Sequence, residues 1–238
     1  MNDREEFKTG WDVFHEVFRA HEVRLQNQFP LARESISGAM RGIDITVAHV
    51  ASFSRNGDVL SQWRGYNDGY GFSLGFDDQA VNSAAQSQHF ELCPVAYERA
   101  EHFEAMQAKF NLLFRELEGG GRPLNVLMML WWQSILRLVT VLKNGHFREE
   151  AEVRLFAGGA ADTDSIKVRA TTKTLIPYVQ MQLDRTAPLL QPHHSLGIIE
   201  VIVGPAMSAN QRFAAECLLQ QHHIDARVHT SSIPYIGT

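Results

Sequence analysis

Cysteine is scarce in this chain of 238 residues, and its scarcity excludes whole classes of protein. The two cysteines, Cys93 and Cys217, are far apart in the sequence and cannot form a zinc site by themselves. A small disulfide scaffold is therefore excluded, and reduced thiols in the cytoplasm are expected. Cys/His clusters and the H-E-x-x-H pattern do not occur either, so we predict no metal site.

Long apolar runs and an excess of basic residues are also missing. The most apolar segment, 124–143, is interrupted by Gln133, Ser134 and Arg137, and so falls short of the roughly 18 residues that a membrane span needs. It predicts a buried core helix and no membrane partner. The 22 Lys and Arg against 27 Asp and Glu give a net charge of -5, which disfavours nucleic acid as a partner. The start of the chain has no secretory signature, which again predicts the cytoplasm, and nothing in the sequence indicates an oligomeric state.

Hydrophobic periodicity predicts helices interleaved with strands. We expect helices over 7–25, closed by Pro30, over 97–117 and 124–143, and after Ser208. We expect strands over 47–53, 70–76, 150–156, 166–170, 198–203 and 228–233. Because no repeat and no regular βα rhythm occur, we predict one α+β domain over residues 1–238, with a mixed central β-sheet flanked by helices.

The segment 61–77 carries the strongest functional signal. Arg64 has a planar fork that suits phosphate or carboxylate, and the flanking Trp63 and Tyr66 can stack on a ring. Glycines such as Gly71 let the backbone approach a ligand closely. These features indicate a nucleotide pocket. They are equally compatible with a hairpin whose aromatic rings pack on the core while Arg64 pairs with a carboxylate.

The same segment contains Gly71-Phe72-Ser73-Leu74-Gly75, which matches the G-x-S-x-G pattern of serine hydrolases. A nucleophilic serine needs a sharp strand-to-helix turn. Here the apolar alternation continues through Ser73 to Phe76, which places Ser73 in the middle of a strand. We therefore reject a serine hydrolase.

A second charged segment follows the apolar helix. In an extended chain Glu150, Glu152 and Arg154 share one face, and Ala151, Val153 and Leu155 share the other. Two carboxylates beside an arginine can act as a general base or bind ribose hydroxyls in a cleft. They can also form a solvated salt-bridge ladder on the surface, and the sequence leaves both alternatives open.

Several motifs, in order along nearly the whole chain, resemble the bacterial domain-of-unknown-function family 2971. They are segments 61–76, 147–155, 167–169, 176–178, 202–205 and 231–235. Residues 1–7 resemble the family's Leu-Asn-Asp-x-x-Glu-Phe element, which in the family follows a segment with a His-bearing strand. This sequence lacks that segment, so chemistry that depends on its histidine is expected to be absent.

The family's layout is similar to that of ADP-ribosyltransferase-like folds, and this similarity implies NAD as the cofactor. It implies that Trp63 or Tyr66 stacks on nicotinamide, that Arg64 holds a phosphate, and that Glu152, preceded by Glu150, binds ribose hydroxyls and stabilises an oxocarbenium ion. The candidate catalytic residues are then Glu152, Glu150 and Tyr66, and the candidate cofactor-binding residues are Trp63, Arg64, Asp68, Gly71, Arg154 and Arg169. The alternative is a non-catalytic nucleotide-sensing or protein-interaction module, because the catalytic set is incomplete.

Overall fold

The structure, a computed structural model, describes residues 7–41, 49–157, 166–172, 174–183 and 197–234. Most of the N-terminal element 1–7 and Tyr235 therefore lie outside the described residues. Helices and strands are both abundant, which confirms the α+β class. The chain divides into two compact units, unit 1 over 1–51 and 93–148 and unit 2 over 52–92 and 149–238. That the two units fold as one domain stays a prediction.

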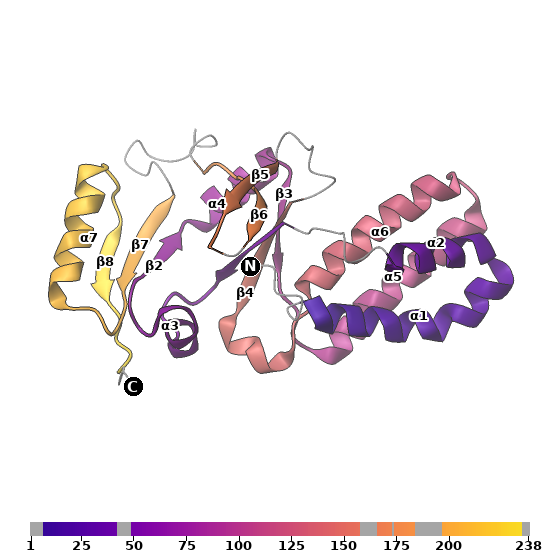
Figure 1. Cartoon of the computed structure of the whole chain (residues 1–238), viewed down its shortest axis with the longest axis horizontal. Helices are drawn as coiled ribbons and strands as arrows, with labels where there is room; N and C mark the ends of the chain where they lie inside the picture. The colour runs from indigo at the N-terminus through magenta and orange to yellow at the C-terminus, as the bar shows by residue number, and fades with distance from the viewer. Residues whose placement is uncertain (1–6, 42–48, 158–165, 173, 184–196, 235–238) are drawn as a thin grey trace. The chain divides into compact units, whose positions relative to one another are not determined.

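Unit 1 is helical. It contains α1 (Lys8–Gln28), α2 (Pro30–Arg41), α5 (Arg99–Gly119) and α6 (Leu124–Val141), followed by the start of a 3-10 helix, η3 (Gly145–Glu150). Figure 1 shows α1, α5 and α6 side by side in this unit. Their buried core includes the aromatic residues Phe14, Phe110 and Trp131. The predicted helices over 7–25 and 97–117 are confirmed. Helix α1 ends at Gln28, just before Pro30, as predicted. Pro30 also opens α2, which was not predicted, because its fixed φ suits the first turn of a helix.

Helix α6 is long and apolar enough to cross a membrane, judged by its length and composition alone. In unit 1 one side of it, including Leu127, Trp131 and Ile135, is buried in the helical core. The predicted core helix is confirmed. The absence of a membrane partner stays a prediction.

Unit 2 holds most of the strands. It contains α3 (Leu60–Asn67), β2 (Phe72–Phe76), α4 (Asp78–Ser87), β4 (Glu152–Ala157), β5 (Ile166–Ala170), β6 (Leu175–Val179), β7 (Ile198–Val203), α7 (Ala209–Gln221) and β8 (Arg227–Thr230). Strands β1 (Val50–Ser54) and β3 (Phe90–Pro94) each cross the boundary between the units. The predicted strand 47–53 overlaps β1, although residues 47 and 48 lie outside the described residues.

The expectation of one mixed central sheet is wrong. The described strands form three small sheets, ordered β1-β4-β3, β2-β7-β8 and β5-β6. The second sheet is mixed, because β7 pairs antiparallel with β2 and parallel with β8. The apolar run of β7 does make it a central strand, as predicted. Alternation of apolar and polar residues identifies a strand but does not identify the strand it pairs with. For this reason the sequence could not distinguish one sheet from several.

The segment around Trp63 is a helix and not a hairpin. Helix α3 ends at Asn67, and its C-cap Asp68 takes a left-handed conformation with φ of 48°. Gly69 and Gly71 also have positive φ, 80° and 91°, and carry the chain sharply into β2. The turn residues that were predicted to join two strands therefore end a helix.

Candidate ligand-binding site

Helix α3 presents two aromatic side chains to one groove of unit 2. Trp63 and Tyr66 are three residues apart and share a side of the helix. Arg64 is exposed and is not one of the residues that line this groove. The groove has a volume of about 260 Å³ and is lined by Ser54, Asn56, Gly57, Gln62, Trp63, Tyr66, Asn67, Tyr70, Gly71, Phe72 and Ser73. We call it the aromatic groove.

The rings of the aromatic groove differ in accessibility. Tyr66 is 63% exposed and Tyr70 is 55% exposed, so both rings can meet a ligand. Trp63 is buried, and its indole Nε1 donates to Asp58 Oδ1 at 2.7 Å. Trp63 therefore forms a wall of the groove, and its N–H is already used.

Asp58 ties α3 to the segment that follows β8. Its carboxylate also accepts from Ser231 Oγ at 2.6 Å and from the backbone N–H of Ser232 at 3.2 Å. Burial acts to raise the pKa of Asp58, but the hydrogen bonds from Ser231, Trp63 and Ser232 and the nearby His229 outweigh it, so the pKa lies below its ordinary value. Asp58 is thus held as an anion that fixes the position of Trp63.

A tight backbone crossing lies behind Trp63. The Gly204 N–H donates to the Gly71 carbonyl at 2.9 Å, and the Ala206 N–H donates to the Gly69 carbonyl at 3.0 Å. A Cβ on Gly204 would lie 2.5 Å from the Gly69 carbonyl oxygen and 3.2 Å from the Trp63 ring. Only glycine fits at position 204. Packing alone therefore accounts for the glycine of segment 202–205, and no bound ligand is needed to explain it.

A second groove continues from the aromatic groove along β2. It has a volume of about 640 Å³ and shares Ser54, Asn56, Gly57, Gln62 and Ser73 with the first. Its charged lining residues are Arg55, Asp78 and Glu200. Since the two grooves share five residues, they form one continuous depression with an aromatic end and a charged end.

Ser73 lies within β2, opposite Ile202 of β7. Its mid-strand position is confirmed, and with it the absence of a strand-to-helix turn at this serine. Ser73 belongs to the floor of the continuous groove and has no nucleophile elbow around it.

The acidic segment is arranged differently from the prediction. Ala151 has a left-handed φ of 42°, and β4 begins only at Glu152, so Glu150 ends η3 and does not extend the strand. Glu152 is 7% exposed and Arg154 is 0% exposed, and Arg154 Nη2 donates to Glu152 Oε2 at 3.0 Å. A solvated ladder is therefore wrong for these two residues: they form a buried ion pair on the central strand of its sheet.

Neither Glu150 nor Glu152 lines the aromatic groove or its charged end. On β4, Val153 lines the charged end. Because side chains alternate along a strand, those of Glu152 and Arg154 point to the opposite face of β4. The structure thus groups Trp63, Tyr66 and Gly71 in one groove. It does not bring Glu150, Glu152 or Arg154 into that groove.

Two further predicted residues also lie outside this groove. Asp68 is the exposed C-cap of α3, and Arg169 is exposed on β5, opposite Ile176 in a two-stranded sheet with β6. Asp68 has a local reason to be there, because aspartate tolerates the left-handed conformation better than most residues.

Most of the polar residues of the groove were not predicted from the sequence. Asn56, Gln62, Tyr70, Arg55 and Glu200 line it without having been singled out. Tyr70 and Gln62 stand inside the aromatic motif and could have been found there, because they flank the same helix and turn. Glu200 could not have been found from the sequence, since a single polar residue in a strand gives no sign of a binding role.

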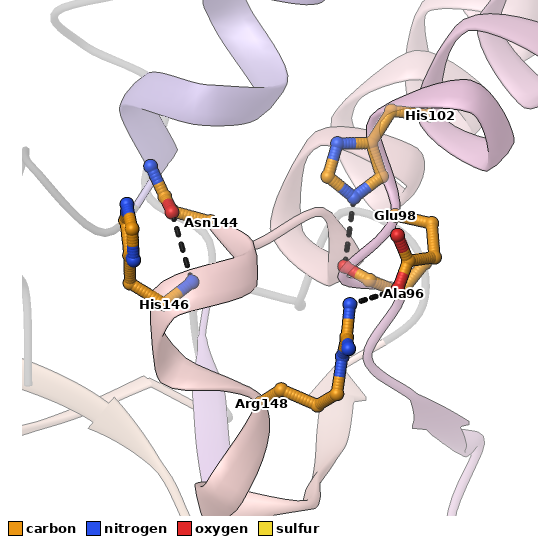
Figure 2. Close-up of polar contacts among 6 residues, drawn as sticks. All are labelled: Ala96, Glu98, His102, Asn144, His146 and Arg148. Atoms are coloured by element: carbon orange, nitrogen blue, oxygen red, sulfur yellow. Dashed lines mark hydrogen bonds and ion pairs between the residues drawn. The ribbon is translucent and has the colours of Figure 1, made fainter.

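A group of polar residues in unit 1 has a structural role (Figure 2). Buried His102 contacts the Ala96 carbonyl through Nε2 at 2.9 Å, so this nitrogen carries the proton. Arg148 pairs with Glu98, and Asn144 Oδ1 accepts from the His146 N–H at 3.0 Å. The Arg148–Glu98 pair joins the segment after α6 to the start of α5, and the other two contacts are local to one segment each. His102 is therefore a packing residue.

Within the described residues no group of three or more His, Cys, Asp or Glu side chains is placed to hold a metal ion. No curated protein and no solved structure matches the chain. Residues 62–155 match the model of the family described as "Protein of unknown function (DUF2971)". The matched region contains the acidic motif and nearly all of the aromatic motif, and the match is consistent with a DUF2971 domain there, the family that the motifs resemble.

Proposed function

We propose that unit 2 is a non-catalytic module that binds a small molecule with a planar, hydrogen-bonding ring, of the nucleoside or nucleotide type. The observation that carries this proposal is the aromatic groove, in which exposed Tyr66 and Tyr70 stand beside the carboxamides of Asn56, Gln62 and Asn67. Aromatic rings stack on the face of a base, and carboxamides offer both a donor and an acceptor to its edge.

The size of the depression supports this class of ligand. The aromatic groove of about 260 Å³ opens into the charged end of about 640 Å³, and small-molecule sites typically enclose about 300–1,000 Å³. Among the described residues, no titratable side chain apart from the two tyrosines lines the aromatic groove, and the carboxylates of Asp78 and Glu200 lie at the charged end. General acid–base catalysis needs such a group beside the reacting atoms, so the lining of the aromatic groove favours binding of a ring without chemistry on the ring itself.

The test is binding of ring compounds to the whole chain, measured by isothermal titration calorimetry with nucleosides and nucleotides. Replacing Tyr66→Ala should weaken binding about tenfold or more, because stacking contributes roughly 1–3 kcal/mol per base. The matched control is Arg64→Ala, on the same helix but outside the groove, which should leave affinity unchanged. If no compound of either class binds, or if Tyr66→Ala binds as well as the wild type, the proposal fails.

A second candidate is an NAD-using ADP-ribosyltransferase or NAD glycohydrolase. The observation that favours it is the buried Glu152–Arg154 pair, because charged residues are rarely buried. This candidate expects nicotinamide release from NAD by the wild type and loss of release in Glu152→Gln. Absence of nicotinamide release, with and without protein acceptors, would remove it and leave the binding module.

A further inference from the structure

We propose that the groove selects a neutral nucleoside over its phosphorylated forms, with the base in the aromatic groove and the sugar at the charged end. This inference rests on the proposed binding function and specifies its ligand. It follows from the charge of the groove and from the geometry around Glu200.

The aromatic groove is suited to an uncharged base. Its polar side chains are the hydroxyls and carboxamides of Ser54, Asn56, Gln62, Asn67 and Ser73, together with the two tyrosines. None of them carries a formal charge at neutral pH. A carboxamide can donate and accept at the same time, as the edge of a heterocyclic base requires.

Glu200 gives the charged end a hydrogen-bond acceptor. Its Oε1 faces Arg227 at 3.5 Å and His229 at 3.9 Å, both on β8. A Cβ built on Gly75 would meet Oε2 at 3.5 Å, so the missing side chain of Gly75 leaves room next to this oxygen. Both Gly75 and Glu200 line the groove. A carboxylate oxygen in such a place can accept the hydroxyls of a ribose, as an acidic residue does in dinucleotide-binding folds.

The same end is poorly suited to phosphate. Of the residues that the structure describes, two carboxylates, Glu200 and Asp78, and one cation, Arg55, line it. The N-terminus of α4, which could attract an anion, is already capped by Asp77, whose Oδ1 accepts from the Ala80 N–H at 2.8 Å. Arg227 pairs with Glu200 but is 82% exposed and does not line the groove, so solvent screens its charge. A phosphate placed here would meet more negative than positive charge.

The experiment is calorimetry of the whole chain with the four common ribonucleosides and their 5′-monophosphates. At least one nucleoside should bind, and its monophosphate should bind at least about tenfold more weakly, because like charges repel in a partly enclosed site. Glu200→Gln removes one negative charge at nearly constant volume. It should weaken nucleoside binding and bring the two affinities within a few-fold of each other.

Asp78→Asn is the second variant. Asp78 is exposed, and its replacement should reduce the ratio of nucleoside affinity to monophosphate affinity. The matched control is Glu104→Gln on α5 in unit 1, which should leave this ratio unchanged. The inference is overturned if monophosphates bind the wild type as tightly as nucleosides do. It is also overturned if the ratio of nucleoside affinity to monophosphate affinity is unchanged in both groove variants. Either result leaves the proposed binding function intact. Failure of every nucleoside and monophosphate to bind would remove both.

Discussion

At the scale of single residues, Asp58 links the structure of unit 2 to its groove. One carboxylate satisfies the Trp63 indole, the Ser231 hydroxyl and the Ser232 N–H, three donors from two distant parts of the chain. Trp63 in turn forms a wall of the aromatic groove. The position of the groove therefore depends on the charge of a residue that makes up none of its lining.

The lowered pKa of Asp58 predicts an acid-sensitive contribution to stability. Because its folded pKa lies below its unfolded value of about 3.9, the ionised carboxylate stabilises the fold at pH values above 3.9, and this stabilisation is lost as the pH falls through the folded pKa. Urea unfolding of Asp58→Asn should show a lower free energy of unfolding than wild type at pH 6. The gap should shrink towards pH 3.

Asp225→Asn, at an exposed aspartate of the same unit, is the control for this experiment and should show no comparable gap. A difference between wild type and Asp58→Asn that stays constant from pH 6 to pH 3 would contradict this role of Asp58.

At the scale of elements, the crossing of the 69–71 turn and Gly204 fixes β2 against β7. The Gly204 Cα lies so close to the Gly69 and Gly71 carbonyls and to the Trp63 ring that a methyl group has no space. Gly204→Ala should therefore lower the free energy of unfolding by about 1–3 kcal/mol, the usual cost of overpacking. Chemical denaturation measures this directly.

Gly65→Ala on α3 is the matched control, because a Cβ there would meet no atom within 4 Å. It should be neutral or slightly stabilising, since alanine favours a helix more than glycine does. Equal effects of the two substitutions would show that the crossing has no special packing.

The elements that the sequence predicts best are those with long, regular periodicity. The apolar residues of α1 and α5 recur over 21 residues each, and both helices were found. Helix α3 has only eight residues and includes Gly65, so its turn residues resembled a hairpin. Short α4 and β6 were missed for the same reason, because a few residues provide too little periodicity.

The charged strand shows a different limit of sequence reasoning. Alternation places Glu152 and Arg154 on one side of β4, but their burial depends on what covers that side, which local sequence does not contain. An ion pair at 3.0 Å lets both groups be buried at a tolerable desolvation cost. The groove is equally hard to predict from local sequence, because Asn56, Gln62 and Glu200 come together only through strand pairing and the packing of α3.

At the scale of the whole molecule, each unit is assembled from two separate stretches of chain. The chain passes between the units after residues 51, 92 and 148, so neither unit is complete until both of its stretches have formed. We expect one cooperative unfolding transition, as is usual for a single domain. Trp11, Trp131 and Trp132 report on unit 1, and Trp63 reports on unit 2.

Fluorine NMR of protein labelled with 5-fluorotryptophan follows all four side chains during a urea titration. The four native signals should disappear with a common midpoint, and Trp63→Phe identifies the signal of unit 2. A separate midpoint for Trp63 would show that the units unfold independently and would contradict the single domain.

The central claim is that the groove of unit 2 is where this protein binds a ligand. A crystal structure of the whole chain soaked with the tightest-binding nucleoside tests it most directly. The base should lie against the Tyr66 and Tyr70 rings, with its sugar towards Glu200. A ligand bound against Glu152 and Arg154, or anywhere else while this groove stays empty, would contradict it.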